Sequence, residues 1–418
     1  MTIDFYLKSY QRFGVHLGLE RIKSLLEKLG NPQQQVPVIH VAGTNGKGSV
    51  CAYLSSILTA AGYRVGRYTS PHLIDWTERI CLNEKPIAET KFIELLDTIQ
   101  SCISLENEAE IPTQFEVITA AAWLYFAQEK VDVAVIEVGL GGRLDATNVV
   151  EHPLVSIITS LSWEHWQVLG PTLQHIALEK AGILKPTCHA VIGVLPPEIA
   201  VVIKSKLDSL RCPAIWITPA KEIVKNDQRW ARYQTIDYPL PLFGDVQLVN
   251  SAIAIAAIQC LHVQGWEISN QAIQEGMAKA RWLGRLQWTS CQDKPLLIDG
   301  AHNIESAQAL RRYVEQLDKP VQWVMGMLST KDHRDIFQAL LRPGDRLYLV
   351  PVPDHSTAEP SVLANLAKEV CPGLASVEIF PELFQGLDTA LNTSNQEKSL
   401  TVLCGSLYLV GYFLGNRH

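Results

Sequence analysis

The sequence predicts an α/β protein with a mostly parallel sheet and a second, smaller α/β domain. Apolar runs alternate with helical patterns along the whole chain, and several of these runs end in a glycine-rich turn or an acidic residue. Continuous apolar strands with helices between them are typical of a parallel sheet covered on both faces. Because 418 residues exceed what one core usually holds, we expect a larger domain over residues 1–287 and a smaller one over residues 288–418.

The composition is that of an ordinary globular protein and excludes some partners. Hydrophobic residues make up 47% of the chain and charged residues 19%, and the formal net charge of −7 argues against nucleic acid as the main partner. The nine cysteines are scattered without a C-x-x-C pair, which suits a reducing cytosol and gives no metal cluster. The N-terminus lacks a signal-peptide core and no apolar stretch reaches membrane-spanning length, so we expect a cytoplasmic protein without a membrane partner.

Periodicity assigns the elements in order. Runs rich in valine and isoleucine predict strands of the first domain over residues 36–42, 131–138, 154–160, 189–194 and 214–217, and helical spacing predicts helices near 49–61, 116–128, 173–181 and 199–210. Residues 218–245 are polar and irregular and receive no assignment. The pattern restarts with strands over 296–299, 321–327, 346–350, 377–380 and 400–404, and with helices near 304–316, 336–341 and 363–370. The boundary falls around residues 285–294, where periodicity is lost.

The segment VPVIHVAGTNGKGS, residues 36–49, is the most informative part of the chain. An apolar strand breaks into a glycine-rich turn that carries Lys47, and Ser49 opens an amphipathic helix that Gly62 ends. A strand, turn and helix of this kind direct backbone N–H groups at one spot, which is a site for the phosphates of a nucleotide. The strict Walker pattern fails because Gly48 separates Lys47 from Ser49, so an ordinary tight turn is the alternative interpretation.

Two further strands end in polar residues that should lie beside this turn. The segment VDVAVIEVGLGGRLDATN brings a buried strand to Glu137, and His165 follows another apolar strand. Ligands of open α/β sheets bind at the carboxyl ends of the strands, and a hard carboxylate at that edge suits Mg²⁺. The alternatives are a carboxylate that caps the next loop and a structural histidine.

Lys180 lies in a helix whose pattern turns its neighbours inward. A partly buried lysine needs an anionic partner or loses its charge. From the residues alone we expect a salt bridge with Glu179 or another carboxylate, and carbamylation to an anionic group is the alternative.

Two short segments allow both a functional and a structural interpretation. Ser70 in YTSPHL could offer a hydroxyl to a metal, although serine before proline is more often only a turn. In IPTQFEV, Phe115 and Glu116 could stack on and hydrogen-bond a flat heterocycle. Thr113 and Glu116 also fit a capping box at a helix N-terminus, which the residue types alone favour.

In the second domain, LLIDGAHN ends a strand at Asp299 and leads to His302, and MGMLSTKDH ends another strand and carries Lys331 and Asp332. Both motifs should emerge at the same edge of the second sheet. Two such faces, one in each domain, suggest an active site in the cleft between them.

Taken in this order, the motifs resemble the folylpolyglutamate synthase/dihydrofolate synthase family of the Mur ligase superfamily. The segments that carry the resemblance are AGTNGKGS, YTSPHL with ERI, TQFE, EVGLGGRLDATN, EKAGI, LGR, DGAHN and the Lys-Asp pair. The resemblance covers essentially the whole chain, starting with GLERIKSLLEKLGNPQ, and cell-wall Mur ligases usually lack an inserted glycine like Gly48. It implies a P-loop-type ATPase domain followed by a Rossmann-like glutamate-ligase domain, in a monomer.

The resemblance also implies a reaction and roles for individual residues. The reaction joins a carboxylate to the amine of L-glutamate through an acyl phosphate, with ATP and Mg²⁺, and the acceptors are dihydropteroate and the glutamate tails of reduced folates. The implied ATP ligands are Gly43, Thr44, Asn45, Gly46, Lys47, Gly48, Ser49, Asn250, Arg285 and Asp299. The implied pterin pocket comprises Thr113, Gln114, Phe115, Glu116, Leu144, Asp145 and Ala146, and the implied metal ligands are Ser70, Glu137 and His165. Lys47, a carbamylated Lys180, and His302 toward glutamate are the implied catalytic residues.

Two residues depart from the family pattern, since Leu283 stands where proline is expected and Glu164 where aspartate is frequent. Phe115-Glu116 resembles the bacterial-type bifunctional enzymes, which favours both activities in this chain. The alternatives are a monofunctional member of the family, a Mur-type ligase acting on a muramyl peptide, and a nucleotide-driven switch. The last would need an N/T-K-x-D run for base recognition, and Thr330-Lys331-Asp332 lacks the spacer residue.

Overall fold

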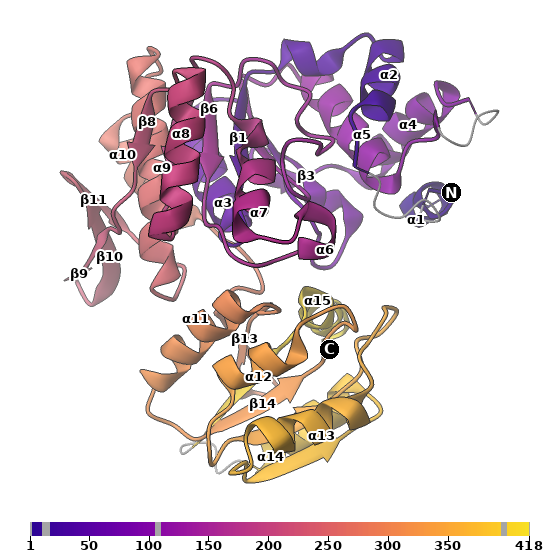
Figure 1. The fold of residues 1–418 in the computed structure, drawn as a ribbon, viewed down its shortest axis with the longest axis vertical. Helices are drawn as coiled ribbons and strands as arrows, with labels where there is room; N and C mark the ends of the chain where they lie inside the picture. Colours follow the sequence, from indigo (N-terminus) through magenta and orange to yellow (C-terminus); the bar gives the residue numbers. More distant parts are fainter. Residues whose placement is uncertain (1, 11–16, 105–109, 394–398, 418) are drawn as a thin grey trace. The chain divides into compact units, whose positions relative to one another are not determined.

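The chain folds into two compact units, shown in a computed structural model that describes residues 2–10, 17–104, 110–393 and 399–417 (Figure 1). Unit 1 comprises Met1–Pro241 and Gln247–Arg281, and unit 2 comprises Leu242–Val246 and Trp282–His418. Unit 2 thus resumes at Trp282, before residue 288, and its first strand, β12 (Gln287–Cys291), pairs antiparallel with β13 (Lys294–Ile298). The segment that lacks clear periodicity is thus one arm of a hairpin in unit 2.

The sheet of unit 1 has eight strands in the order β4-β3-β2-β5-β1-β6-β7-β8. They are β1 (Val38–Ala42), β2 (Val65–Tyr68), β3 (Ile80–Leu82), β4 (Lys85–Pro86), β5 (Val133–Glu137), β6 (Val155–Ile158), β7 (His189–Ile192) and β8 (Ala214–Trp216). In this spatial order, β2, β5, β1, β6, β7 and β8 each pair in parallel with the next strand. At the β2 edge, β3 and β4 are added antiparallel. This confirms the mostly parallel sheet, and β1 lies buried at its centre between β5 and β6.

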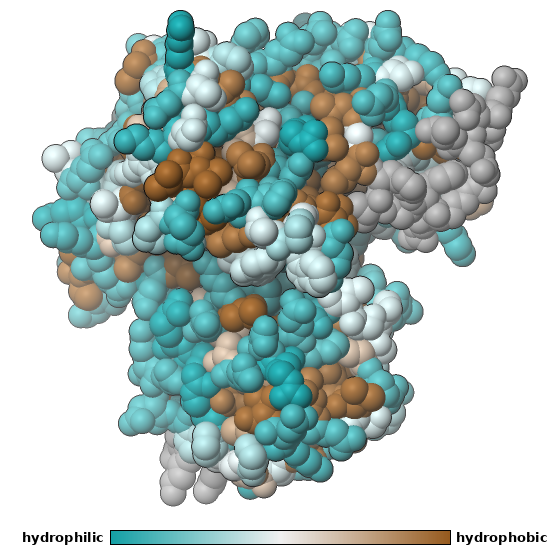
Figure 2. Space-filling model, viewed as in Figure 1, coloured by the Kyte–Doolittle hydropathy of each residue, from teal (hydrophilic) through white to brown (hydrophobic). Residues whose placement is uncertain are grey.

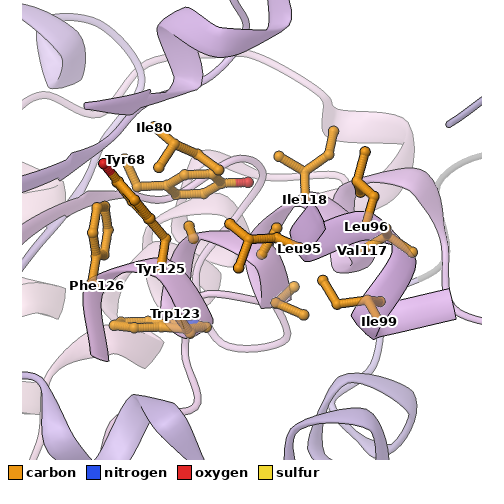
Figure 3. Packing of buried hydrophobic residues seen from close by; sticks show 14 of the residues in the cluster. Tyr68, Ile80, Leu95, Leu96, Ile99, Val117, Ile118, Trp123, Tyr125 and Phe126 are labelled. Carbon is orange, nitrogen blue, oxygen red and sulfur yellow. The ribbon is translucent and has the colours of Figure 1, made fainter. Parts of the chain in front are cut away.

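Helices cover both faces of this sheet. On one face, α3 (Lys47–Ala60) packs on β1, β2 and β5, and α10 (Asn270–Lys279) packs on α3. On the other face, side chains of β2 and β3 meet those of α4 (Glu89–Ser101) and α5 (Gln114–Gln128) in an aromatic-rich core (Figure 3). The same core holds residues of α1 (Ile3–Lys8) and α2 (Glu20–Lys28), while α7 (Leu173–Lys180) and α8 (Pro197–Leu210) form a separate cluster with β6 and β7.

The prediction of an amphipathic helix from Ser49 is wrong in two respects. Helix α3 begins at Lys47, and every residue from 49 to 58 is buried. Both sides of this helix are covered because α10 lies on the side that faces away from the sheet. At that contact a Cβ on Gly276 would overlap the backbone of Ile57, so the glycine allows the two helices to approach closely.

Several elements of unit 1 were not predicted, among them β2–β4, α4, α10, a second sheet and the helix α9. The unassigned segment forms an antiparallel three-stranded sheet of β9 (Lys221–Lys225), β10 (Gln228–Tyr233) and β11 (Ile236–Pro239). Helix α9 (Val246–Val263) is 18 residues long with a mean hydropathy of 1.6, so the expectation that no apolar stretch reaches membrane-spanning length is wrong. Since 67% of that stretch is buried inside the protein, the helix is accounted for as a core element. The surface seen in Figure 2 is mainly hydrophilic, with smaller apolar groups between.

Unit 2 is a second α/β domain with the strand order β12-β13-β17-β14-β15-β16. From β13 to β16 the pairs are parallel, with β14 (Val321–Met325), β15 (Arg346–Leu349), β16 (Ser376–Ile379) and β17 (Leu400–Cys404). Its core cluster joins the sheet to α11 (Ile304–Glu315), α12 (His333–Leu340) and α13 (Pro360–Val370), and α14 (Leu383–Thr393) and α15 (Leu407–Asn416) also pack on the strands. The predicted smaller α/β domain is confirmed.

Candidate active site

The glycine turn, Gly43–Gly46, joins β1 to α3 and is fastened to the loop that follows β6. Thr44 N donates to Ser160 O at 2.8 Å, and Asn45 N donates to Ser160 Oγ at 3.0 Å. The Thr159 hydroxyl donates in return to Asn45 O at 2.6 Å. The turn is therefore held by hydrogen bonds from a neighbouring strand end, which fixes it before any ligand binds.

Glycine is required in the turn by contact as well as by backbone angle. Gly43 has a φ of 147°, and a Cβ there would overlap the Thr159 hydroxyl. Gly46 has a φ of 87° and precedes the first residue of α3, where a Cβ would overlap the amide oxygen of Asn250 on α9. Among the described residues, no side chain caps the N-terminus of α3. Its first N–H groups remain directed at the turn, as in helix termini that bind anions.

Two lysines meet at one carbonyl of the turn. Lys47 Nζ donates to Gly43 O at 3.1 Å and to Thr44 O at 3.0 Å, and Lys180 Nζ donates to the same Gly43 O at 2.7 Å. Burial, reinforced by the positive charge of Lys47, lowers the pKa of the Lys180 ammonium to about 7. At neutral pH a large fraction of Lys180 is therefore an uncharged amine with a nucleophilic lone pair.

The predicted salt bridge between Lys180 and Glu179 is wrong. Glu179 pairs instead with Arg143, whose Nε and Nη2 donate to Glu179 Oε1 at 2.9 and 2.8 Å. Successive residues of a helix point about 100° apart, so the half-buried Glu179 points in a different direction from the buried Lys180. Lys180 is 3% exposed, and its partner is a backbone carbonyl.

The structure brings Ser70 and Glu137 together at the carboxyl edge of the sheet. Ser70 N, just beyond β2, donates to Glu137 Oε2 at 3.2 Å, and Glu137 is buried at the end of β5. His165 comes from the loop after β6, with a φ of 51°, and its Nε2 lies 3.9 Å from Glu164 Oε1. A carboxylate and a hydroxyl are the hard oxygen donors that suit Mg²⁺, whose other positions usually go to water and phosphate oxygens.

Thr113 and Glu116 form the capping box that the residue types favour. Glu116 N donates to Thr113 Oγ1 at 3.3 Å, and Thr113 N donates to Glu116 Oε2 at 2.6 Å. The same carboxylate oxygen accepts from Arg21 Nε at 3.1 Å. The other oxygen, Oε1, is buried and has no hydrogen-bond partner among the residues that the structure describes. The cap thus leaves one acceptor unused, so the functional interpretation remains open beside the structural one.

Phe115 links this helix start to the turn that follows Glu137. Its ring packs on Gly139, where a Cβ would overlap the ring atoms, and lies 6.1 Å from the ring of Tyr68. Gln114 donates to Leu7 O at 3.3 Å, which directs its amide toward the N-terminal helix. The half-buried face of Phe115 therefore stands close to the carboxyl ends of β2 and β5.

The segment Leu144–Ala146 lies in the turn beyond Gly139. Asp145 is 3% exposed and accepts from Leu140 N at 2.9 Å, Thr147 N at 3.0 Å and Thr147 Oγ1 at 2.5 Å. These donors hold the turn closed, and burial raises the pKa of the Asp145 carboxyl. Leu144 is half-buried and Ala146 is buried.

The positions expected in unit 2 gather at the ends of β13 and its loop. Asp299 is buried and accepts from Leu286 N at 2.7 Å and from Ala301 N at 2.8 Å, and burial raises the pKa of its carboxyl although Arg285 opposes this. His302 Nδ1 donates to Gly300 O at 2.8 Å. Asp299 thus fixes the two segments that carry Arg285 and His302.

Several residues that hold the site were not predicted. Gln247 on α9 bonds Ser49 at 3.4 Å, Tyr53 at 3.2 Å and Asn250 at 3.3 Å, so it supports the start of α3. Arg21 fixes Glu116 from a helix far away in sequence. The hydroxyl pair directly after an apolar strand, Thr159-Ser160, is the one signal in the sequence that could have indicated a partner for the turn.

Comparison with known proteins agrees with this geometry. Residues 41–258 match the Mur ligase middle domain, and residues 284–416 match the dihydrofolate synthetase C-terminal domain. The chain is 35% identical to the dihydrofolate synthase/folylpolyglutamate synthase of Escherichia coli, over 98% of this chain and 93% of that protein. Crystal structures of Mycobacterium tuberculosis folylpolyglutamate synthase complexed with ADP and AMPPCP superpose with a TM-score of 0.87 at 29% identity, with 99% of both chains covered.

A bifunctional folylpolyglutamate synthase/dihydrofolate synthase with Mn, AMPPNP and L-glutamate bound is also similar, with a TM-score of 0.83, 29% identity, and coverage of 99% of this chain and 97% of that one. Sequence and fold agree over nearly the whole length. The chain therefore belongs to the dihydrofolate synthase/folylpolyglutamate synthase family of the Mur ligases, and it is an ATP-dependent ligase.

Proposed function

We propose that the chain is a bifunctional ligase that adds L-glutamate to dihydropteroate and to the glutamate tail of reduced folates, acting in the cytoplasm as a monomer. Each reaction forms an amide from a carboxylate and the glutamate amine. Because a carboxylate is a poor electrophile, its oxygen first accepts the terminal phosphoryl group of ATP. The amine then attacks the acyl carbon, and phosphate leaves from the tetrahedral intermediate.

One observation carries the proposal for unit 1: the ring of Phe115 packs on Gly139, two residues beyond Glu137. Glu116 follows Phe115 in the chain, and its buried Oε1 has no hydrogen-bond partner among the described residues. A pterin offers a flat ring for stacking and amino and ring N–H donors for such an acceptor. The ring of Phe115 therefore lies next to the turn that follows Glu137, the carboxylate that we expect to bind the metal, which suits an acceptor whose reacting end must approach the nucleotide phosphates.

We assign the phosphates of ATP to the glycine turn. The N–H groups at the start of α3 and the ammonium of Lys47 would surround them, and Asn250 borders Gly46. Phosphoryl transfer depends mainly on positioning and on neutralising spread-out negative charge, which these groups supply. Ser70, Glu137 and His165 would hold Mg²⁺, which neutralises charge on the phosphates when it is bound.

We assign a carbamate to Lys180. Its uncharged Nζ would attack carbon dioxide, a new N–C bond would form, and the displaced proton would pass to solvent. Burial favours this because it lowers the pKa of the ammonium, and the product places a negative charge near Lys47. In unit 2, Asp299 would orient Arg285 toward ATP, and His302 would orient the incoming L-glutamate.

The test is turnover of the purified protein with ATP, Mg²⁺ and L-glutamate, with dihydropteroate and tetrahydrofolate compared as acceptors. The proposal predicts phosphate release and a product one glutamyl unit heavier with both. Activity with tetrahydrofolate alone would refute the bifunctional claim. No turnover with either, but turnover with a UDP-linked muramyl peptide, would make the chain a Mur-type amino-acid ligase.

A further inference from the structure

His40 stands in the middle of β1, three residues before the glycine turn, and is fully buried. Its register partners are Ile136 on β5 and Ser156 on β6. Side chains alternate along a strand, so His40 shares a face of the sheet with Val38 and Ala42. A polar ring at the centre of a buried parallel sheet costs folding free energy unless its nitrogens are used.

One nitrogen of the ring is used. His40 Nε2 lies 2.9 Å from Thr147 Oγ1, a hydroxyl in the turn after β5. Thr147 Oγ1 lies 2.5 Å from Asp145 Oδ1, and Asp145 also accepts the N–H groups of Leu140 and Thr147. A chain of contacts therefore runs from the central strand to the Leu144–Ala146 segment.

The donors and acceptors in the hydrogen bonds between His40, Thr147 and Asp145 follow from the number of protons available. Both oxygens of Asp145 accept backbone N–H groups, so the carboxyl acts as an acceptor and the single hydroxyl proton of Thr147 goes to Asp145. The lone pairs of Thr147 Oγ1 then face His40, and Nε2 must donate. His40 Nδ1 has no partner among the described residues, so it must be the nitrogen without a proton. The opposite direction would leave a buried N–H without an acceptor, and orphaned N–H groups are the rarer kind.

We propose that His40 is a positioning residue: held as the neutral Nε2–H tautomer, it orients the Thr147 hydroxyl and through it fixes Asp145 and the Leu144–Ala146 side of the acceptor pocket. This inference rests on the proposed function insofar as that segment binds the pterin. Burial lowers the pKa of the His40 imidazole to about 3, which agrees with a ring that stays neutral. Fixing a binding turn before the substrate arrives reduces the entropy lost on binding.

The chain offers matched variants that separate positioning from stability. His40→Gln can place an amide N–H where Nε2 is, and His40→Met fills a similar volume without a donor. Ser156→Ala is the control, because Ser156 is the register partner of His40 on β6 and its buried hydroxyl donates to Ile183 O at 3.0 Å rather than to Thr147 or Asp145. Thr147→Val removes the hydroxyl that links His40 to Asp145.

The experiment measures KM for dihydropteroate, ATP and L-glutamate with the full chain. We expect His40→Met and Thr147→Val to raise KM for dihydropteroate about tenfold, the usual effect of leaving a buried partner unpaired, while KM for ATP stays within about twofold. His40→Gln should recover most of the affinity, and Ser156→Ala should match the wild type. Equal losses for all substrates, or no recovery with glutamine, would overturn the proposal.

A second readout does not depend on turnover or on the folding of the His40 variants. Nitrogen chemical shifts of the labelled imidazole in the wild-type chain distinguish a protonated from a bare ring nitrogen. The proposal requires Nε2 to carry the proton and Nδ1 to be bare, and a protonated Nδ1 would overturn it. If the wild type fails to turn over dihydropteroate, the proposed function fails. The tautomer measurement would still decide whether the hydrogen-bond chain runs from His40 to Asp145.

Discussion

Lys180 Nζ donates to the carbonyl oxygen of Gly43 at 2.7 Å, although the two residues are 137 positions apart in the chain. The contact joins the end of α7 to the first residue of the glycine turn. It places an amine of lowered pKa at the point where phosphate charge would gather.

Carbon dioxide should activate the enzyme in a pH-dependent manner. The pKa of Lys180 is about 7, so the uncharged amine that can be carbamylated becomes the main form as the pH rises through that value. In degassed buffer, turnover should fall because the carbamate is lost. Added bicarbonate should restore turnover more effectively above about pH 7 than below it. Lys180→Arg should abolish the bicarbonate effect, and Lys185→Arg, a change in the same segment, should not. A bicarbonate effect that survives in Lys180→Arg would contradict the assignment.

The free energy of unfolding should depend on pH because Lys180 is buried. The pKa of Lys180 is near 10.5 when unfolded and about 7 when folded, so between these values the unfolded chain binds the extra proton and wild-type stability rises with pH. Below about pH 7 the folded state holds a buried charge, which costs on the order of a few kcal/mol. In CO₂-free buffer, urea unfolding should therefore give Lys180→Met a higher free energy of unfolding than the wild type, and the difference should be largest at low pH. The advantage should fade toward pH 10.5, and a constant difference would contradict this.

The glycine turn should tolerate no side chain at Gly46. Gly46→Ala combines a positive φ with overlap against Asn250, whereas Gly62→Ala at the other end of α3 has a similar φ of 92° and nothing within 4 Å. Both variants should lose about 1 kcal/mol of stability from the backbone. Only Gly46→Ala should raise KM for ATP, by about tenfold or more, since one misplaced N–H group weakens phosphate contacts. Similar kinetics for the two variants would show that the contact with Asn250 is irrelevant.

Glu116→Gln should separate the cap from the pocket. Glutamine can complete a capping box, so the start of α5 should survive. Its neutral amide removes the carboxylate acceptor at Oε1, and KM for dihydropteroate should rise at least several-fold while KM for L-glutamate stays unchanged. Thr113→Ala, which breaks the cap itself, serves as the comparison and should lower the free energy of unfolding by about 1 kcal/mol. A Glu116→Gln variant with wild-type kinetics would limit Glu116 to the cap.

His302 should act on the glutamate half of the reaction. Its Nδ1 donates to Gly300 O, which fixes the ring in the loop after β13, where we propose that the incoming glutamate binds. His302→Ala should raise KM for L-glutamate about tenfold and leave KM for ATP nearly unchanged. His333→Ala is the matched control, because His333 Nε2 is engaged with Leu328 O at 2.9 Å in the same unit. Equal effects of the two variants would remove His302 from the proposed role.

The sequence predicted most readily the strands in which every residue is buried. Strands such as β1 and β5 are buried on both faces and read as continuous apolar runs, so their ends and the residues that follow them could be placed. The same logic failed for α9, because a helix buried on nearly all sides has no period to detect. It failed for β9–β11 because these short strands mix polar and apolar residues and are only partly buried, so they show neither a continuous apolar run nor a strict alternation.

The site could be predicted only where chemistry follows a strand end. Glu137 and Asp299 were found in that way. The partner of Lys180 was not, because burial sends its ammonium to a backbone carbonyl that no residue pattern encodes. Arg21 and Gln247 were missed for the same reason, since their contacts join segments about 95 or more positions apart.

The most direct test of the account follows the oxygens of dihydropteroate labelled in its carboxylate with a heavy isotope. If the carboxylate becomes an acyl phosphate, one of its oxygens leaves with the phosphate at each turnover. Mass spectrometry should then find one labelled oxygen per released phosphate, in an amount equal to the dihydrofolate formed. Released phosphate without label would show that the carboxylate is never phosphorylated and would contradict the mechanism.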